Sequence, residues 1–178
     1  MTIIFEKLSR AFNKLRPDTV NKSPWLLTAE GIATLPRPLD LAIRAHNHAA
    51  VQNLLDLGAK PNLNTHFSGP ALNEAVRTQD LSMVQRVVRG GGDVDGVNKA
   101  GSTPLHEAAA LYDRCAAVLI AEFLLGKGAR LDLKNDMGFT PAEWARELGN
   151  QPVFDCLQAA ARQRIADVPK SAPKPPHA

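Results

Sequence analysis

Apolar residues along the chain fall into short segments with helical spacing, and these segments recur. In the first of them Val51, Leu54 and Leu55 form one apolar face, as in an amphipathic helix. The pattern returns in three aligned segments, 51–62, 84–95 and 121–132. Each apolar face is followed by a glycine, Gly58, Gly91 or Gly128. A glycine ends a helix well because it adopts the left-handed conformation, so each segment is predicted to be a helix that stops there.

A second apolar pattern precedes each of these helices, so the repeating unit contains two helices. Equivalent residues lie 33 positions apart, as Leu72 and Leu105 do, and Glu74 aligns with Glu107 in the same way. The patterns occupy 35–44, 68–77 and 101–110, and a fourth copy begins at 138. Pro104 and Pro141 follow threonines and suit the first position of a helix, where a missing N–H costs little. The third unit is four residues longer than the others, between Tyr112 and Ile120.

These motifs together resemble the ankyrin repeat. The resemblance is carried by Thr-Pro-Leu-His at 103–106 and Leu-Leu-x-x-Gly-Ala at 124–129, at a period of 33 residues, and it covers 35–160. The first two units depart from the motif, with Arg-Pro-Leu-Asp at 37–40 and Pro-Ala-Leu-Asn at 70–73. The resemblance implies an all-α solenoid of helix–turn–helix units joined by short hairpin-like turns. About four repeats are expected, at 35–67, 68–100, 101–137 and 138–161.

The two ends of the chain differ from the repeats. An open stack exposes apolar end faces, so atypical capping segments are expected. In residues 1–16 the apolar side chains fall on one helical stripe and the charges lie opposite, which predicts an amphipathic capping helix that ends before Pro17. Residues up to 34 would form a connector. The basic, proline-rich residues 162–178 cannot build a core and are predicted to be disordered.

Charge is distributed unevenly along the 178 residues. Residues 1–16 and 162–178 each carry four basic residues against one acidic residue, which leaves a net charge of −3 for the body of a chain whose total is +3. The basic isoelectric point therefore comes from the ends, and no nucleic-acid partner is expected. A content of 44% hydrophobic and 22% charged residues is typical of a folded protein.

The apolar runs and the two cysteines indicate where in the cell the protein is expected. No apolar run approaches the roughly 20 residues that span a bilayer, and the N-terminal segment lacks the apolar core of a secretory signal. Cys115 and Cys156 lie far apart, without metal-ligand spacing, as ordinary thiols in a reducing compartment do. We expect a cytoplasmic, monomeric protein.

Residues with possible chemistry have structural interpretations. His46 and His48 lack a third residue spaced to share a metal, and Gly90 to Gly92 follow a helix, whereas a phosphate loop precedes one. The acidic pairs recur after the glycines, as turn residues would: Asp93 with Asp95, and Asp132 with Asp136. The resemblance implies that His106 hydrogen-bonds backbone between repeats. We therefore expect no enzyme activity, catalytic residue, cofactor or metal.

The resemblance implies that the chain binds another protein through turn tips and the exposed side of each first helix. Carried onto this sequence, those positions are Asn64, His66, Phe67, Arg77, Thr78, Lys99, Ser102, Leu111, Tyr112, Lys134, Asp136, Met137, Phe139 and Glu147. Large aromatic residues often anchor interfaces, although Tyr112 and Phe139 would also suit packing between repeats, as would Trp144.

Several roles fit a protein-binding module of this kind. It would act as an inhibitor, an immunity-type protein, an adaptor, or an effector on host proteins. The alternative is a peripheral membrane protein anchored by the basic helix predicted at 1–16, since a cationic amphipathic helix can lie on an acidic membrane surface.

Overall fold

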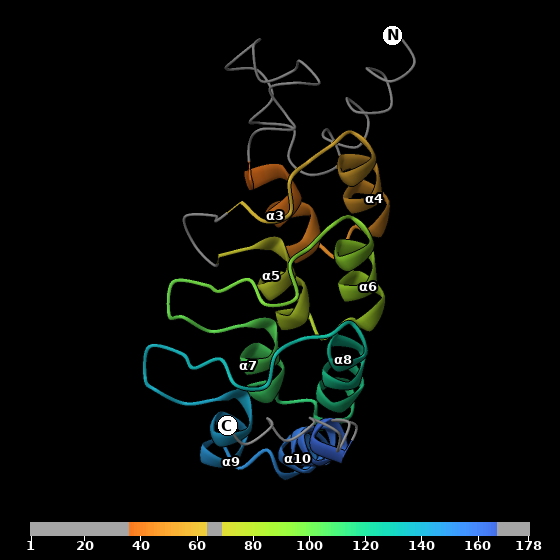
Figure 1. The fold of residues 1–178 in the computed structure, drawn as a ribbon. Coiled ribbons are helices and arrows are strands. Elements are labelled where there is room, and N and C mark those ends of the chain that lie inside the picture. The colour runs from red at the N-terminus through yellow and green to blue at the C-terminus, as the bar shows by residue number, and fades with distance from the viewer. Residues whose placement is uncertain (1–35, 64–68, 167–178) are drawn as a thin grey trace, which may run out of the picture.

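The computed structural model describes residues 36–63 and 69–166, and the regular elements within them are all α-helices. The eight helices of these described residues form four consecutive pairs: α3 (Pro36–Arg44) with α4 (His48–Asp56), α5 (Ala71–Arg77) with α6 (Leu81–Arg89), α7 (Pro104–Ala109) with α8 (Arg114–Gly126), and α9 (Pro141–Glu147) with α10 (Gln151–Ala166). The pairs stack so that α3, α5, α7 and α9 form one column and the other four form a second (Figure 1). The predicted all-α solenoid is confirmed.

The second helix of each of the first three pairs begins at a polar capping residue. Asn47, Asp80 and Asp113, which are 33 positions apart, precede α4, α6 and α8. Their side-chain oxygens accept backbone N–H groups of the first turn, for example at 2.9 Å from Ser82 to Asp80 and 3.0 Å from Cys115 to Asp113. A side-chain acceptor at this position satisfies a donor that the helix itself cannot pair. These caps therefore fix where α4, α6 and α8 start.

The predicted glycine stops are present at the other end of these helices. Gly58, Gly91 and Gly128 have φ angles of 86°, 90° and 90°. The next residue then donates its N–H back into the helix, as from Ala129 to the carbonyl of Leu124 at 3.1 Å. This is the left-handed cap that satisfies the last carbonyls, and it turns the chain toward the next repeat.

The core lies between the two columns. Leucines of the first helices and aliphatic residues of the second are fully buried, among them Leu72, Leu105, Val84 and Leu124. Small residues at the repeat positions, such as Ala75 and Ala108, are also fully buried and let neighbouring helices approach closely. Leu125 is only partly buried against this core.

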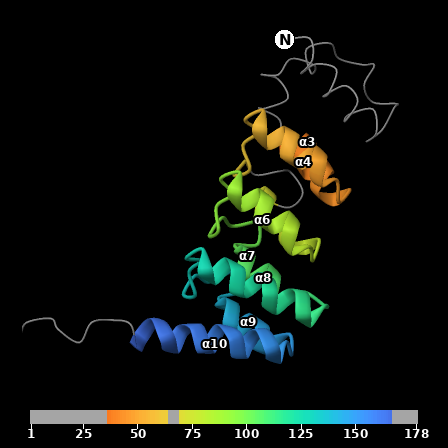
Figure 2. The ribbon, with the colours of Figure 1, turned by 90° about the vertical axis from the view of Figure 1, so that its right-hand side faces the viewer.

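The four extra residues of the third repeat form one more helical turn. Helix α8 has 13 residues, whereas α4 and α6 have nine each. Its last turn meets the end of α10, where Arg164 Nη2 donates to the carbonyl of Leu125 at 3.4 Å. Figure 2 shows the two long helices, one above the other. Helix α10 has 16 residues and ends at Ala166. Residues 162–166, which the sequence assigned to the tail, are therefore helical.

Three predicted features lie outside the described residues. They are the capping helix and connector at 1–34, the first turn tip around residue 67, and the tail from 167 onward. Within the residues that the structure does describe, no helix has both the length and the apolar character needed to cross a membrane.

Candidate protein-binding face

Two turn tips are built by asparagines that occupy equivalent positions. Asn98 donates its N–H to the carbonyl of Ser102 at 3.0 Å, and its Oδ1 accepts the N–H groups of Ala100 and Ser102. Asn135 makes the same contacts in the next repeat, with Met137 and Phe139 as the N–H donors. Each tip therefore has a defined backbone conformation without being part of a sheet.

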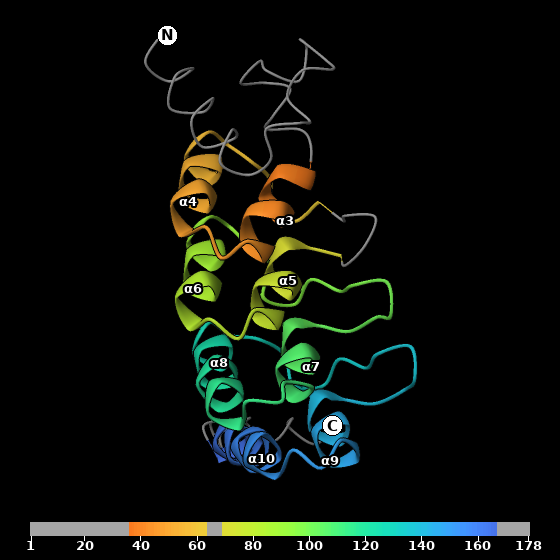
Figure 3. The ribbon, with the colours of Figure 1, turned by 180° about the vertical axis from the view of Figure 1, so that it is seen from behind.

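Neighbouring tips touch one another. The N–H of Asp136 donates to the carbonyl of Ala100 at 3.0 Å. Gly101 lies against Asp136 so closely that an added Cβ would come within 2.9 Å of the Asp136 nitrogen. The loops that carry the tips project to the same side of the stack, beyond the column of α5, α7 and α9 (Figures 1 and 3). We call the exposed side of α3, α5, α7 and α9, together with these tips, the inner face.

His106 joins the third repeat to the tip of the fourth. Its Nδ1 accepts the N–H of Thr103 at 3.2 Å, so the ring proton is on Nε2, which donates to the carbonyl of Phe139 at 2.9 Å. The ring is buried, and burial lowers the pKa of His106 although the bond to Phe139 acts in the opposite direction. The expectation that this histidine hydrogen-bonds backbone between repeats is confirmed.

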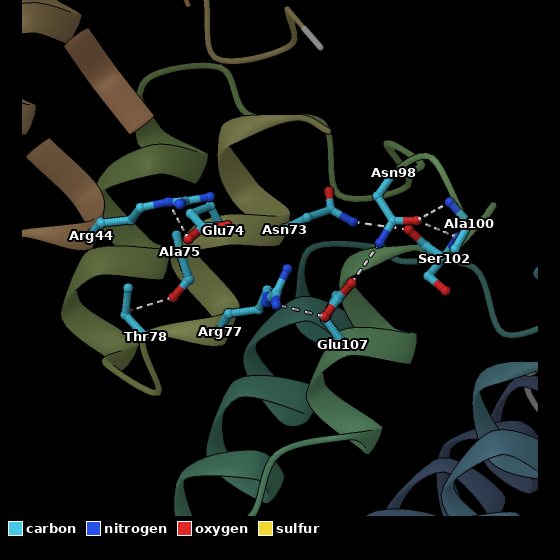
Figure 4. Close-up of polar contacts among 10 residues, drawn as sticks. All are labelled: Arg44, Asn73, Glu74, Ala75, Arg77, Thr78, Asn98, Ala100, Ser102 and Glu107. Atoms are coloured by element: carbon cyan, nitrogen blue, oxygen red, sulfur yellow. Dashed lines mark hydrogen bonds and ion pairs between the residues drawn. The ribbon is translucent and has the colours of Figure 1, made fainter. Parts of the chain in front are cut away.

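Ion pairs run across the inner face from one repeat to the next (Figure 4). Arg44 Nε lies 2.8 Å from Glu74 Oε1, and Arg77 Nε lies 4.0 Å from Glu107 Oε2. Arg44 also lies 3.5 Å from Asp40 in its own helix. Each pair connects the end of one first-column helix to the middle of the next. We call Arg44, Glu74, Arg77 and Glu107 the ion ladder.

The arginine and the glutamate of each ion pair differ in exposure. The Arg77 side chain is 55% exposed, whereas that of Glu107 is 15% exposed beneath it. Burial raises the pKa of the Glu107 carboxyl. The charge of Arg77 and a 2.6 Å hydrogen bond from Asn98 Nδ2 partly offset this increase. The outermost charge of this part of the inner face is therefore positive.

The ladder stops at the fourth repeat. Ala110 occupies the position of Arg44 and Arg77, and Trp144 occupies the position of Glu74 and Glu107. Both Trp144 and Phe139 are half-buried, and their ring centroids are 5.7 Å apart. Here the inner face changes from charged to apolar.

Exposed apolar residues also occur in the turns of this part of the stack. Met137 at the last tip is 67% exposed, and Tyr112 in the turn between α7 and α8 is 87% exposed. Leu148 is exposed in the neighbouring turn between α9 and α10. A bond of 2.8 Å from Arg114 Nη1 to the carbonyl of Gly149 holds these two turns side by side. We call Ala110, Tyr112, Met137, Trp144 and Leu148 the apolar end.

The residues predicted to contact a partner fall into three groups. Those exposed in the structure are Arg77, Lys99, Tyr112, Lys134, Asp136, Met137 and Glu147. Those partly buried are Thr78, Ser102, Leu111 and Phe139. Asn64, His66 and Phe67 lie outside the described residues. Among the partly buried residues, Thr78 Oγ1 donates to the Ala75 carbonyl at 2.7 Å, and the Ser102 carbonyl accepts Asn73 Nδ2 at 2.9 Å, so both also support the fold.

The ion ladder was missed in this prediction, apart from Arg77. The repetition that marks it is visible in the sequence, because Arg44 and Arg77 lie 33 residues apart, as do Glu74 and Glu107. The residues that form each ion pair are 30 positions apart, however. Each arginine contacts a glutamate that lies three positions before the arginine's equivalent position in the next repeat. An alignment of equivalent residues does not show such a diagonal contact.

The residues considered for metal or acid–base chemistry have structural contacts. His46 lies in the turn between α3 and α4, as predicted, and His48 Nε2 lies 2.9 Å from Asp80 Oδ2. Asp93 Oδ1 accepts the N–H of Asp95 at 3.0 Å, which is the predicted turn role. Asp132 pairs with Arg130 at 2.7 Å. Within 36–63 and 69–166, no three His, Cys, Asp or Glu residues are grouped so that they could hold a metal.

Comparisons with known proteins agree with this architecture. A family model described as ankyrin repeats, in three copies, matches residues 72–167, which is more than half of the chain. The human ankyrin repeat domain-containing protein 63 is 32% identical over 149 residues, which cover 76% of this chain and 37% of that protein. The putative ankyrin repeat protein YahD of Escherichia coli K12 is 38% identical over 108 residues, which cover 58% and 54% of the two chains.

A solved structure shows the same fold. The ankyrin repeat domain of Bcl-3, described as a unique member of the IkappaB protein family, superposes with a TM-score of 0.59 at 30% identity. The match covers 67% of this chain and 50% of that one, so this chain spans about half or less of the length of the relatives it matches. The paired helices, the glycine stops and the family match together show that the chain belongs to the ankyrin-repeat family.

Proposed function

We propose that this chain is a non-catalytic module that holds a partner protein on its inner face. Ankyrin repeats are generally protein-interaction modules. The observation that carries the proposal is Met137, a large apolar side chain that is 67% exposed on a tip whose backbone Asn135 fixes. A preorganised apolar side chain loses little entropy on binding, which suits an interface anchor.

The inner face has the extent that such an interface needs. It includes four first-column helices and the two described tips, which project to one side. A stable protein–protein interface buries on the order of 1,600 Å² in total, and a few residues supply most of the binding energy. Among the exposed residues predicted to contact a partner, Lys99, Asp136 and Met137 lie at the tips, and Arg77 and Glu147 end first-column helices, which supports this proposal.

The role of the module depends on its partner. An inhibitor, an immunity-type protein, an adaptor and an effector all use a face of this kind. A cytoplasmic location is part of the proposal, since Cys115 and Cys156 are free thiols, as is usual in a reducing compartment.

The test is affinity capture with the full chain, identification of the retained protein, and titration calorimetry with the purified pair. Met137→Asp is expected to weaken binding, whereas Arg89→Ala, an exposed position at the end of α6 in the other column, is the control. Equal loss for both variants would contradict the inner face as the binding surface. Co-sedimentation with acidic vesicles that requires residues 1–16, without any protein partner, would favour the membrane alternative instead.

A further inference from the structure

The ion ladder ends where the apolar end begins, and this boundary carries chemical information about the partner. Arg77 is the last arginine of its row, and Ala110 and Trp144 follow in place of the next pair. We infer that the docked partner segment carries a carboxylate that binds Arg77 and a large apolar side chain that packs against Ala110 and Trp144. The inference rests on the proposed function and adds the chemistry of the partner.

Arg77 is suited to bind a carboxylate from outside the chain. Its contact with Glu107 is made through Nε at 4.0 Å, which is longer than a charge-assisted hydrogen bond. Glu107 already accepts a hydrogen bond from Asn98 at 2.6 Å. A guanidinium has five N–H donors in a fork that matches a carboxylate in two parallel bonds. An incoming carboxylate can therefore bind the exposed part of Arg77 while Glu107 stays hydrogen-bonded.

The neighbouring position offers an apolar contact. Ala110 is small and exposed, where the two preceding repeats have arginines. Trp144 is half-buried with Phe139 packed on its ring, and it occupies the position that faces the arginine in the two preceding repeats. An apolar side chain placed there would be removed from water against an aromatic surface, which favours binding.

The geometry of the stack sets the spacing of the two partner groups. Neighbouring helices pack about 8–10 Å apart, so the Arg77 row and the Ala110 row are separated by about that distance. An extended chain advances about 3.3–3.6 Å per residue. A partner segment that runs along the stack would therefore carry the carboxylate and the apolar residue about three positions apart.

Charge complementarity identifies the occupant as a segment of another protein. The two ends of this chain, 1–16 and 162–178, each carry a net charge of +3. With one acidic residue each, these segments supply few carboxylates for Arg77. An acidic segment of another protein with a large apolar side chain can bind Arg77 and pack against Ala110 and Trp144 at the same time.

The experiment selects the partner chemistry directly. Phage-displayed random 12-residue peptides are panned on the immobilised full chain, and enriched peptides are synthesised with a fluorescent label for anisotropy titration. The expected peptides carry Asp or Glu about three positions from a large apolar residue. Arg77→Glu should raise their Kd by about tenfold or more, because hydrogen bonds to charged groups contribute at that level. Arg77→Gln, which removes the charge without reversing it, should act in the same direction.

Two further variants complete the design. Ala110→Arg continues the arginine row over Trp144, and it should weaken the same peptides because the apolar contact is covered. Arg89→Glu, at an exposed site in the other column of helices, should leave the Kd unchanged. Circular dichroism of each variant verifies that the helical content is retained.

The outcomes separate the inference from the proposed function. Enriched peptides without a carboxylate, an unchanged Kd for Arg77→Glu, or no enrichment at all would overturn the inference. If Met137→Ala still weakens the peptides, the inner face remains the binding surface. If Arg77, Ala110 and Met137 variants are all without effect, the proposed function fails as well. A dimer in sedimentation that Arg77→Glu dissociates would make a second copy the occupant and overturn the inference.

Discussion

His106 Nε2 lies 2.9 Å from the carbonyl oxygen of Phe139, 33 residues later in the chain. Thr103 donates to the other ring nitrogen, so the neutral ring bridges the start of one helix to the tip of the next repeat. A protonated ring would lose its acceptor at Nδ1. The integrity of the stack is therefore expected to depend on pH through this residue.

Acid should weaken the folded state through His106. Its folded pKa is lowered, chiefly by burial, whereas in the unfolded chain it titrates near the ordinary histidine value of about 6.5. Its contribution to stability is therefore complete above about pH 6.5 and declines as the pH falls from there through the lower folded pKa. Urea melts at pH 7.5 and 5.5 measure this loss. His106→Gln should be less stable at pH 7.5 and lose less on acidification; an equal loss would contradict the assignment.

Leu124 should contribute far more to stability than its neighbour Leu125. Leu124 is fully buried, and Leu124→Ala should lower the free energy of unfolding by roughly 2–5 kcal/mol. Leu125 is only partly buried, so Leu125→Ala should cost less. Because each repeat packs on its neighbours, the whole short stack should respond. Urea melts followed by circular dichroism test this pair, and a change below about 0.5 kcal/mol for Leu124→Ala would contradict its position in the core.

The periodic framework could be predicted because it repeats at equivalent positions. The glycines at 58, 91 and 128, the buried alanines and the bridging role of His106 all follow from motifs aligned at 33 residues or from the family they resemble. The extra length of the third repeat was visible in the sequence as four residues between Tyr112 and Ile120, but the alignment alone did not show that they lengthen α8 to 13 residues. The ion ladder depends on contacts between residues at different positions in successive repeats, and the periodicity does not specify these.

The end of α10 should stabilise the longer third repeat. Arg164 donates to the carbonyl of Leu125 in the last turn of α8, so a chain that stops after residue 161 loses this contact and the last turn of α10. A chain that stops after residue 166 keeps both and serves as the control. We expect a lower melting temperature for the shorter chain alone. Equal melting temperatures would mean that residues 162–166 contribute nothing to the stack.

Gly101→Ala should lower the free energy of unfolding by more than the strain of a left-handed alanine alone would. Gly101 has a φ of 66°, and an added Cβ would meet Asp136 of the next tip. Gly58→Ala is the matched control, because Gly58 has a φ of 86° but nothing within 4 Å of an added Cβ. The control should cost about 1–2 kcal/mol from the left-handed backbone. Gly101→Ala should cost more and should also weaken partner binding; equal unfolding energies in urea would contradict the close packing of the tips.

The binding face itself is tested by removing its anchors. The double change Phe67→Ala and Phe139→Ala is expected to weaken partner binding by at least ~2 kcal/mol, the level at which an interface residue counts as an anchor. Phe139 also packs on Trp144 at 5.7 Å between ring centroids, so this variant requires a measurement of stability alongside binding.

Met137→Ala makes the sharper test of the same face. Met137 is 67% exposed, and its tip is held by the Asn135 side chain, whose Oδ1 accepts the N–H groups of Met137 and Phe139, so losing the Met137 side chain should leave the fold unchanged. Any loss of binding then reports on the interface alone. Gln85→Ala, on α6 in the other column, is the control and should have little effect, as should Gln52→Ala on α4. Titration calorimetry with the captured partner gives the answer: if the glutamine variants abolish binding and Met137→Ala does not, the partner binds the opposite side of the stack.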